Sequence, residues 1–188
     1  KIAASVLGQA LDLLREGKPA RLTVPKDEEE HRTLDQAQLL TSKPVLYVCN
    51  VDEGSAAKGN ELSARVFEKA KSEGAEAVVV SAAIEAEIVT MPAEDRGEFL
   101  ADLGLDETGL TRVIRAGYAL LHLITFFTVG PKETRAWTVT KGSKAPQAAG
   151  VIHTDFERGF IRAETIAYDD YIACKGESGA RDAGKLRS

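Results

Sequence analysis

The chain has 188 residues and a mass of 20.2 kDa, which is enough for one medium domain or two small ones. Its composition is 44% hydrophobic and 28% charged with two cysteines, which excludes a disordered chain, a collagen-like repeat and a disulfide scaffold. The net charge of −5 is unevenly distributed: residues 26–111 carry −11 and residues 112–171 carry +2, so a domain boundary is expected near Leu110. No apolar run approaches the ~20 residues of a membrane span. The sequence therefore predicts a soluble, cytoplasmic protein with no membrane partner.

Two helices are predicted before the first strand. Apolar residues recur at helical spacing over residues 1–16, and Gly17 ends that helix. A second helix is expected to open near Asp27, because carboxylates favour the positive N-terminal end of a helix, and to continue through Leu34 to Leu40. Helices of this length are marginal in water on their own, so we expect the two to pack as an antiparallel pair.

A β-α-β unit is predicted next. Two apolar runs, VLYVCN at 45–50 and AVVVSA at 77–82, have the length and β-branched content of strands buried on both faces of a parallel sheet. The helix between them is expected over Glu61–Ser72, with Gly74 as its C-terminal cap. Because such crossovers are right-handed, both strands end at the same edge of the sheet, where ligands bind in open α/β sheets. Cys49, within the first run, is expected to be a small core residue rather than a reactive thiol.

The pattern changes in the last third of the chain. Short helices are expected at 85–91 and 94–103, and a longer helix starts near Asp106. Short strands separated by Gly, Pro and Lys turns follow, with one helix around Lys144–Ala149 between them. The predicted strands are Ile124–Val129, Arg135–Val139 and Phe160–Ile166. Residues 175–188 are rich in Gly and charge and are expected to be mobile on their own.

Polar residues at the two strand ends are the most informative feature. Asn50 follows the first strand, and Ser81–Ala83 follow the second. A side-chain amide can bond the edge of a purine, and a small Ser-Ala turn lets backbone N–H groups approach the same base. P-loop GTPases combine such a turn with the motif Asn-Lys-x-Asp. In this sequence Val51 replaces the Lys of that motif and Glu53 replaces the Asp. That Asp reads guanine donors that adenine lacks, so Glu53 weakens the case for GTP and permits ATP. On spacing alone, ordinary turn residues after buried strands explain the pattern equally well.

Longer stretches of the sequence resemble the YchF family of Obg-like ATPases. They are KPVLYVCNVDE, AEAVVVSAAIEAEI and the highly specific AWTVTKGSKAPQAAGVIHTDFERGFIRAE, and the resemblance runs from about Gly17 to the C-terminus. It implies an α/β chain in three parts. Residues 1–43 resemble a helical coiled-coil arm remnant with its return helix, and residues 44–123 the C-terminal half of a parallel-sheet P-loop nucleotide domain. Residues 124–188 resemble a C-terminally incomplete β-grasp (TGS) domain.

The resemblance also implies a function. It implies a protein that binds and hydrolyses ATP with Mg²⁺ and associates with the large ribosomal subunit or RNA. GTP binding, a nucleotide-gated ribosome or RNA-binding factor with secondary hydrolysis, and a TGS-type regulatory module remain as alternatives. The residues it places around the base are Asn50, Val51, Glu53, Ser81, Ala82 and Ala83.

No catalytic or metal-binding residue is assigned to this chain. The family's phosphate-binding loop is expected N-terminal to Lys1. The nearest match, Gly179–Leu186, ends in Leu rather than a hydroxyl residue and follows no buried strand. The three histidines lack zinc-ligand spacing. The chain alone is therefore expected to be inactive as an ATPase.

The basic last third carries a candidate RNA surface. Its cations alternate with Trp137, Phe156 and Phe160, and a positive surface with aromatics can bind RNA through phosphate pairing and base stacking. The candidate contacts are Lys132, Arg135, Lys141, Lys144, Arg158 and Arg162. From composition alone, these aromatic residues are expected to form the core of a small domain rather than to bind RNA. The family resemblance favours RNA binding. No sequence-specific DNA contact is expected.

Overall fold

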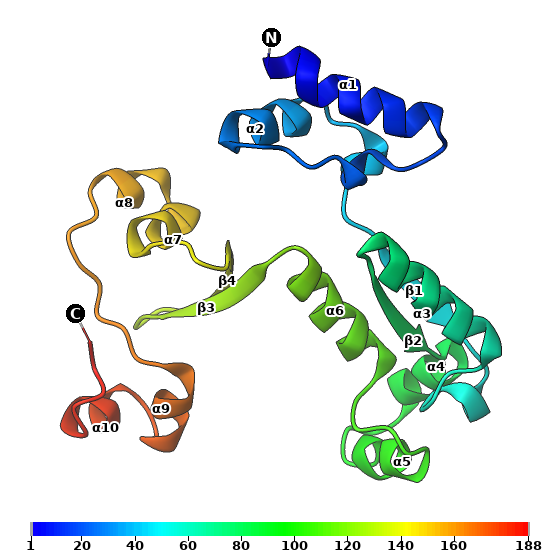
Figure 1. The fold of residues 1–188 in the computed structure, drawn as a ribbon. Helices are drawn as coiled ribbons and strands as arrows, with labels where there is room; N and C mark the ends of the chain where they lie inside the picture. Colours follow the sequence, from blue (N-terminus) through cyan, green and yellow to red (C-terminus); the bar gives the residue numbers. More distant parts are fainter. Residues whose placement is uncertain (1, 188) are drawn as a thin grey trace. The chain divides into compact units, whose positions relative to one another are not determined.

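A computed structural model describes residues 2–187 and shows a mixed α/β chain (Figure 1). Two compact units divide after His122. The first unit contains helices around a two-stranded parallel sheet, and the second contains a two-stranded antiparallel sheet followed by short helices. Within the described residues, no helix is long and apolar enough to cross a membrane.

The first two helices share a small hydrophobic core. α1 spans Ile2–Arg15 and α2 spans Glu28–Gln36, and the two lie side by side (Figure 1). Asp27 begins α2 as predicted, because its carboxylate accepts hydrogen bonds from the backbone N–H groups of Glu29 and Glu30. The buried residues of this core are Val6, Ala10, Ala20 and Leu34. The two helices therefore stabilise each other, as the marginal stability of isolated helices requires.

The predicted β-α-β unit is confirmed. β1 spans Leu46–Asn50 and β2 spans Glu76–Val80, and they pair in parallel. α3 connects them over Glu61–Glu73 and ends at Gly74, whose positive φ of 64° gives the left-handed C-terminal cap. In this register Asn50 lies beside Val80, so both strands end level at one edge of the sheet.

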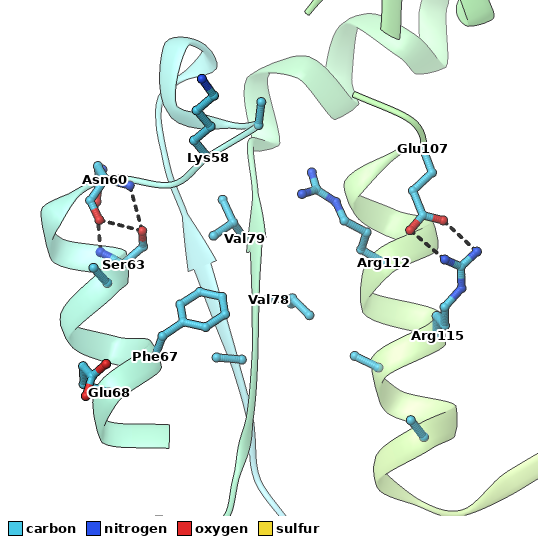
Figure 2. A pocket seen from close by; sticks show the side chains of 15 residues that line it. Lys58, Asn60, Ser63, Phe67, Glu68, Val78, Val79, Glu107, Arg112 and Arg115 are labelled. Carbon is cyan, nitrogen blue, oxygen red and sulfur yellow. Dashed lines mark hydrogen bonds and ion pairs between the residues drawn. The ribbon is translucent and has the colours of Figure 1, made fainter. Parts of the chain in front are cut away.

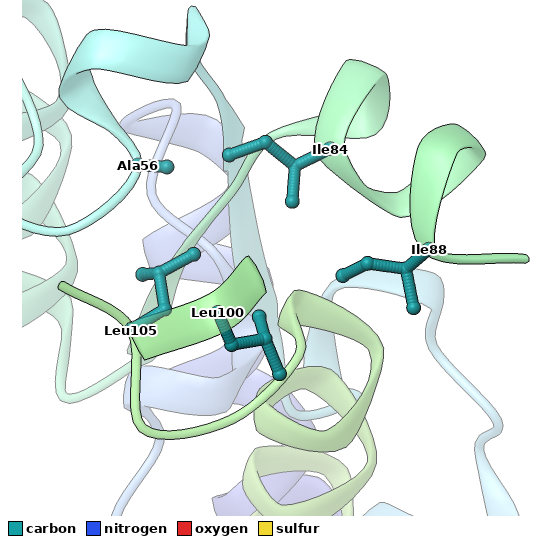
Figure 3. Close-up of a cluster of buried hydrophobic side chains, with 5 residues drawn as sticks. All are labelled: Ala56, Ile84, Ile88, Leu100 and Leu105. Atoms are coloured by element: carbon teal, nitrogen blue, oxygen red, sulfur yellow. The ribbon is translucent and has the colours of Figure 1, made fainter. Parts of the chain in front are cut away.

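The helices after β2 form the second core of the first unit. α4 spans Ala82–Thr90, α5 spans Arg96–Asp102 and α6 spans Gly109–Leu120. Figure 3 shows the apolar side chains that converge between α4, α5 and the loop after β1. They are Ala56, Ile84, Ile88, Leu100 and Leu105. This core holds the start of α4 directly behind the end of β2.

The second unit begins with a hairpin at the predicted place. β3 spans Leu123–Val129 and β4 spans Thr134–Thr140, with antiparallel pairing throughout. The indole N–H of Trp137 donates a hydrogen bond to the Thr128 hydroxyl across the pair, at 2.9 Å. The helices that follow are α7 (Ala145–Ile152), α8 (Thr154–Arg158), α9 (Tyr168–Ala173) and α10 (Glu177–Asp182).

Several predictions for individual segments are wrong. Residues 160–166 form no strand: the described segment makes one isolated bridge, between Thr165 and Arg187, and the side chain of Ile161 is 91% exposed. The segment 175–188 contains the short helix α10, and its expected mobility stays a prediction. α2 stops at Gln36 instead of continuing to Leu40. In each case the local pattern was ambiguous and packing decided the outcome.

The first predicted strand is also less buried than expected. Among the described residues β1 has β2 as its one strand neighbour, so Val48 remains 49% exposed and Cys49 is half-buried. A strand needs neighbours or cover on each side to be buried on both faces. The predicted burial on both faces is therefore wrong for the part of the chain described.

Glu73, at the end of α3, connects the N-terminal segment to the sheet. Its carboxylate accepts hydrogen bonds from Arg21 at 2.7 Å, from the Tyr47 hydroxyl at 2.8 Å and from Lys69 at 2.6 Å. The hydrogen bonds from Lys69, Tyr47 and Arg21 lower the pKa of Glu73 from 4.5 to about 2. Because the folded-state pKa is depressed, ionised Glu73 stabilises the fold above pH 4.5, and this contribution is lost as pH falls towards about 2.

This linkage predicts an acid-dependent effect of Glu73→Gln. At pH 7 the variant is expected to unfold at lower urea concentration than the parent, and the difference should shrink as the pH falls from 4.5 towards 2. Urea unfolding across this pH range, on the full-length protein, measures it. Glu68→Gln is the matched control, since Glu68 is an exposed carboxylate on the same helix. A difference between parent and Glu73→Gln that is independent of pH would contradict the linkage.

Candidate functional site

The carboxyl ends of β1 and β2 form the candidate site. Asn50 is the last residue of β1, and its side-chain Oδ1 accepts a hydrogen bond from the backbone N–H of Ala82 at 3.0 Å. The two polar motifs singled out in the sequence are therefore in direct contact. The same bond orients the amide: with Oδ1 turned to Ala82, Nδ2 is left as a donor for a ligand.

The start of α4 supplies further donors. The helix begins at Ala82 without a side-chain cap from Ser81, and the first N–H groups of any helix lack partners within it. Among the described residues no hydrogen bond satisfies the Oγ of Ser81, although this residue is only 2% exposed. Ala83 follows within the first turn. The start of α4 thus places backbone N–H groups beside Asn50 at the positive end of a helix, whereas the Ser81 hydroxyl is buried behind them.

Val51 and Glu53 differ in how the structure places them. The N–H of Val51 donates to the carbonyl of Val80 at 2.9 Å, which extends the parallel ladder past the end of β1. Its own carbonyl receives no hydrogen bond from the described part of the chain. Glu53 begins the short 3-10 helix η3 (Glu53–Ser55), its side chain is exposed, and it is not hydrogen-bonded to the other candidate residues. The described contacts therefore join Asn50 to Ala82 and Val51 to the end of β2, and none of them involves the Glu53 carboxylate.

One residue of the site was missed by the sequence analysis. The Glu85 carboxylate of α4 accepts hydrogen bonds from the backbone N–H groups of Gly109 at 2.6 Å and of Leu110 at 3.2 Å, and so binds the N-terminus of α6. A Cβ atom at Gly109 would lie 3.1 Å from the side chain of Val80, so glycine permits this close approach. Glu85 is a positioning residue for the start of α4. No local signal points to it, because its partners lie 24 residues or more along the chain.

The described residues offer neither a metal site nor a phosphate-binding loop. Among the described residues, no group of three or more His, Cys, Asp and Glu side chains could hold a metal ion, so the residues present do not fit the Mg²⁺ that the resemblance implies. Gly179 lies within α10, with no strand leading into that helix. The Gly179–Leu186 match thus lacks the strand–loop–helix context of a phosphate-binding loop.

The candidate RNA contacts all lie on the second unit with exposed side chains. They are Lys132, Arg135, Lys141, Lys144, Arg158 and Arg162. The Arg135 guanidinium lies 4.3 Å from the centre of the Trp137 ring, a cation–π contact between an exposed and a half-buried residue of β4. None of the six forms an ion pair with a described residue, so their charge is available to an anionic partner.

Similar proteins were found for the whole chain. Residues 123–188 match the family YchF-GTPase_C, described as "Protein of unknown function (DUF933)". The chain is 50% identical over 184 residues to the ribosome-binding ATPase YchF of Bacillus subtilis, which covers 97% of this chain and 50% of that protein. It is 52% identical over 187 residues to the ribosome-binding ATPase YchF of Haemophilus influenzae, covering 100% of this chain and 51% of that protein.

A eukaryotic relative and a solved structure agree with these. Obg-like ATPase 1 of Rattus norvegicus is 41% identical over 173 residues, which is 90% of this chain and 43% of that protein. The fold matches the structure of the Schizosaccharomyces pombe YchF GTPase with a TM-score of 0.80 and 32% identity, over 98% of this chain and 50% of that one. The chain thus spans about half the length of the relatives it matches.

Proposed function

The chain belongs to the YchF family, and from this premise we propose that it supplies the base-recognition part of an ATP-binding and ATP-hydrolysing protein that associates with ribosomes. The observation that carries the proposal is the hydrogen bond from Ala82 to Asn50, which joins the two strand-end motifs into one site. The relatives, a ribosome-binding ATPase and an Obg-like ATPase, supply ATP hydrolysis and ribosome binding as the activities to test. A ribosome partner also implies the cytoplasm.

The arrangement of donors and acceptors favours adenine over guanine. In the proposed complex Nδ2 of Asn50 donates to N7, which both purines carry. The free carbonyl of Val51 accepts from the 6-amino group of adenine, whereas guanine presents a second acceptor, O6, at that position. Glu53 is longer than the aspartate that reads guanine and lies exposed on η3. These features support ATP as the nucleotide.

Cleavage of ATP is assigned in this proposal to the part of the full-length protein outside this chain. Phosphoryl transfer depends on positioning and on charge stabilisation by phosphate-binding backbone, cations and Mg²⁺. The described residues include no cluster for a metal ion. This chain contributes by holding the base, which positions the phosphates of ATP for the part of the protein that cleaves it. The chain purified alone is therefore expected to show no ATPase activity above background.

The nucleotide preference is tested by calorimetry on the full-length protein. ATP is expected to bind more tightly than GTP. Glu53→Asp restores the carboxylate length that reads guanine, and GTP affinity should then rise by about tenfold. Asp52→Glu, the reverse change at the neighbouring exposed carboxylate, is the control and should leave the preference unaltered. Tighter binding of GTP than of ATP by the parent protein would contradict the assignment of adenine.

Ribosome association is proposed to involve the exposed cations of the second unit. Replacing Lys132, Arg135 and Lys144 together by Glu is expected to weaken co-sedimentation with ribosomes by about tenfold or more and to flatten its dependence on salt. Replacing Lys26, Lys43 and Lys71 together by Glu makes the same change in net charge on the first unit and serves as the control. Equal co-sedimentation of the two triple variants would exclude the second-unit cations as the contact surface.

A further inference from the structure

The edge of β2 facing away from β1 has no strand beside it among the described residues. The hydrogen bond from Val51 N–H to Val80 C=O shows that the backbone groups of Val80 point towards β1. Backbone direction alternates along a strand, so the N–H and C=O groups of Ala77 and Val79 point to the open edge. Unpaired edge groups of this kind are a template for another extended chain.

A groove of about 680 Å³ runs along this open edge. Figure 2 shows it between α3 and α6, with Val79 of β2 turned towards α3 and Val78 turned towards α6. Phe67 of α3, 42% exposed, forms one apolar wall, and Ala116 of α6 lines the other side. The middle of the groove is therefore apolar and wide enough for side chains of an added strand.

Positive charge is concentrated at one end of the groove. Figure 2 shows Lys58 and Arg112 at the end near Asn60, whereas Glu68 lies towards the other end. Neither cation forms an ion pair with a described residue, and Nε of Arg112 is buried without a hydrogen-bond partner. Among the residues that the structure describes, Arg112 donates one hydrogen bond, from Nη1 to the carbonyl of Ala56 at 3.4 Å.

The neighbouring arginine differs from these two. Arg115 is paired with Glu107 at 2.8 Å, so its charge is already balanced. The uncompensated charge is thus that of Lys58 and Arg112, which lie beside the groove and can meet carboxylates of a ligand.

We propose that the open edge of β2 is a docking site for an extended segment of a partner protein that pairs with β2 as an added strand. Its acidic residues lie at the end near Lys58 and Arg112, and an apolar side chain packs on Phe67 and Val79. Main-chain hydrogen bonds to Ala77 and Val79 supply affinity, and the side-chain contacts supply specificity. The site is separate from the nucleotide edge and does not depend on the proposed function.

Binding of two synthetic peptides to the full-length protein tests this proposal. One fluorescein-labelled peptide alternates valine and threonine and carries two aspartates at one end, and the other carries two lysines there. By fluorescence anisotropy, the acidic peptide is expected to bind about tenfold or more tightly than the basic one. It should also slow amide hydrogen exchange over Glu76–Val80, because the free N–H groups of the edge become paired.

Substitutions identify the groups responsible. Lys58→Glu is expected to weaken binding of the acidic peptide by about tenfold. Lys71→Glu, which reverses an exposed lysine of α3 outside the groove, should leave it unchanged. Val79→Pro removes an N–H that points to the open edge and should abolish binding. If that variant fails to fold, the comparison of Lys58→Glu with Lys71→Glu still decides the question.

Three outcomes would overturn the proposal. The first is no binding of the acidic peptide, or equal affinity for both peptides. The second is an affinity that Lys58→Glu leaves unchanged. The third is protection of Glu76–Val80 by a concentration-dependent dimer without peptide, since a second copy would then occupy the edge.

Discussion

Replacing Asn50 with alanine is expected to weaken ATP binding to the full-length protein by about ten- to a hundredfold. The substitution removes the Nδ2 donor proposed for the base. It also removes the acceptor that holds the backbone N–H of Ala82, at 3.0 Å, so the start of α4 loses its link to β1. Isothermal calorimetry with ATP measures the loss, and thermal unfolding of the same samples reports any change in stability.

Asn50→Asp separates the two roles of this side chain. Aspartate keeps an oxygen for the N–H of Ala82 but replaces the amide donor by a second acceptor. We therefore expect Asn50→Asp to unfold at the parental temperature while binding ATP as weakly as Asn50→Ala. Parental ATP affinity in Asn50→Asp would show that the amide does not contact the base.

The second large effect is expected for Ile84→Ala, which should lower the free energy of unfolding by about 3 kcal/mol. Ile84 lies in the first turn of α4, is 2% exposed and packs in the core that includes Ala56 and Leu105 (Figure 3). Truncation removes buried methylene and methyl groups and leaves a cavity. Because this core holds the start of α4, ATP affinity should fall together with stability.

Val89→Ala is the matched control for Ile84→Ala. Val89 lies on the same helix, but its side chain is 76% exposed, so its truncation is expected to change stability by no more than about 0.5 kcal/mol. Urea unfolding of both variants in the full-length protein gives the comparison. Similar destabilisation by the two substitutions would be incompatible with a core that depends on Ile84.

The elements with strong local signals were predicted well. The β-α-β unit followed from two apolar runs and a glycine cap, and its parallel pairing is confirmed. The wrong prediction for residues 160–166 has a tertiary cause: a strand needs a neighbour along its length, and among the described residues this segment pairs at one position, Thr165 with Arg187. The base-side residues remain predictions. The structure nevertheless joins Asn50 to Ala82, as a shared sheet edge requires.

Taken alone, the sequence determined the β-α-β unit, the N-terminus of α2 and the C-terminus of α3, and which family the chain resembles. Helix caps and hydrophobic periodicity depend on a few neighbouring residues, so the sequence alone placed the start of α2 near Asp27 and identified Gly74 as the C-terminal cap of α3. Only the tertiary structure decided which distant polar groups meet. The contacts of Glu73 with Arg21 and of Glu85 with Gly109 join segments far apart in the chain. The open edge of β2 likewise depends on which strands pair, because long-range contacts are set by register and packing rather than by local pattern.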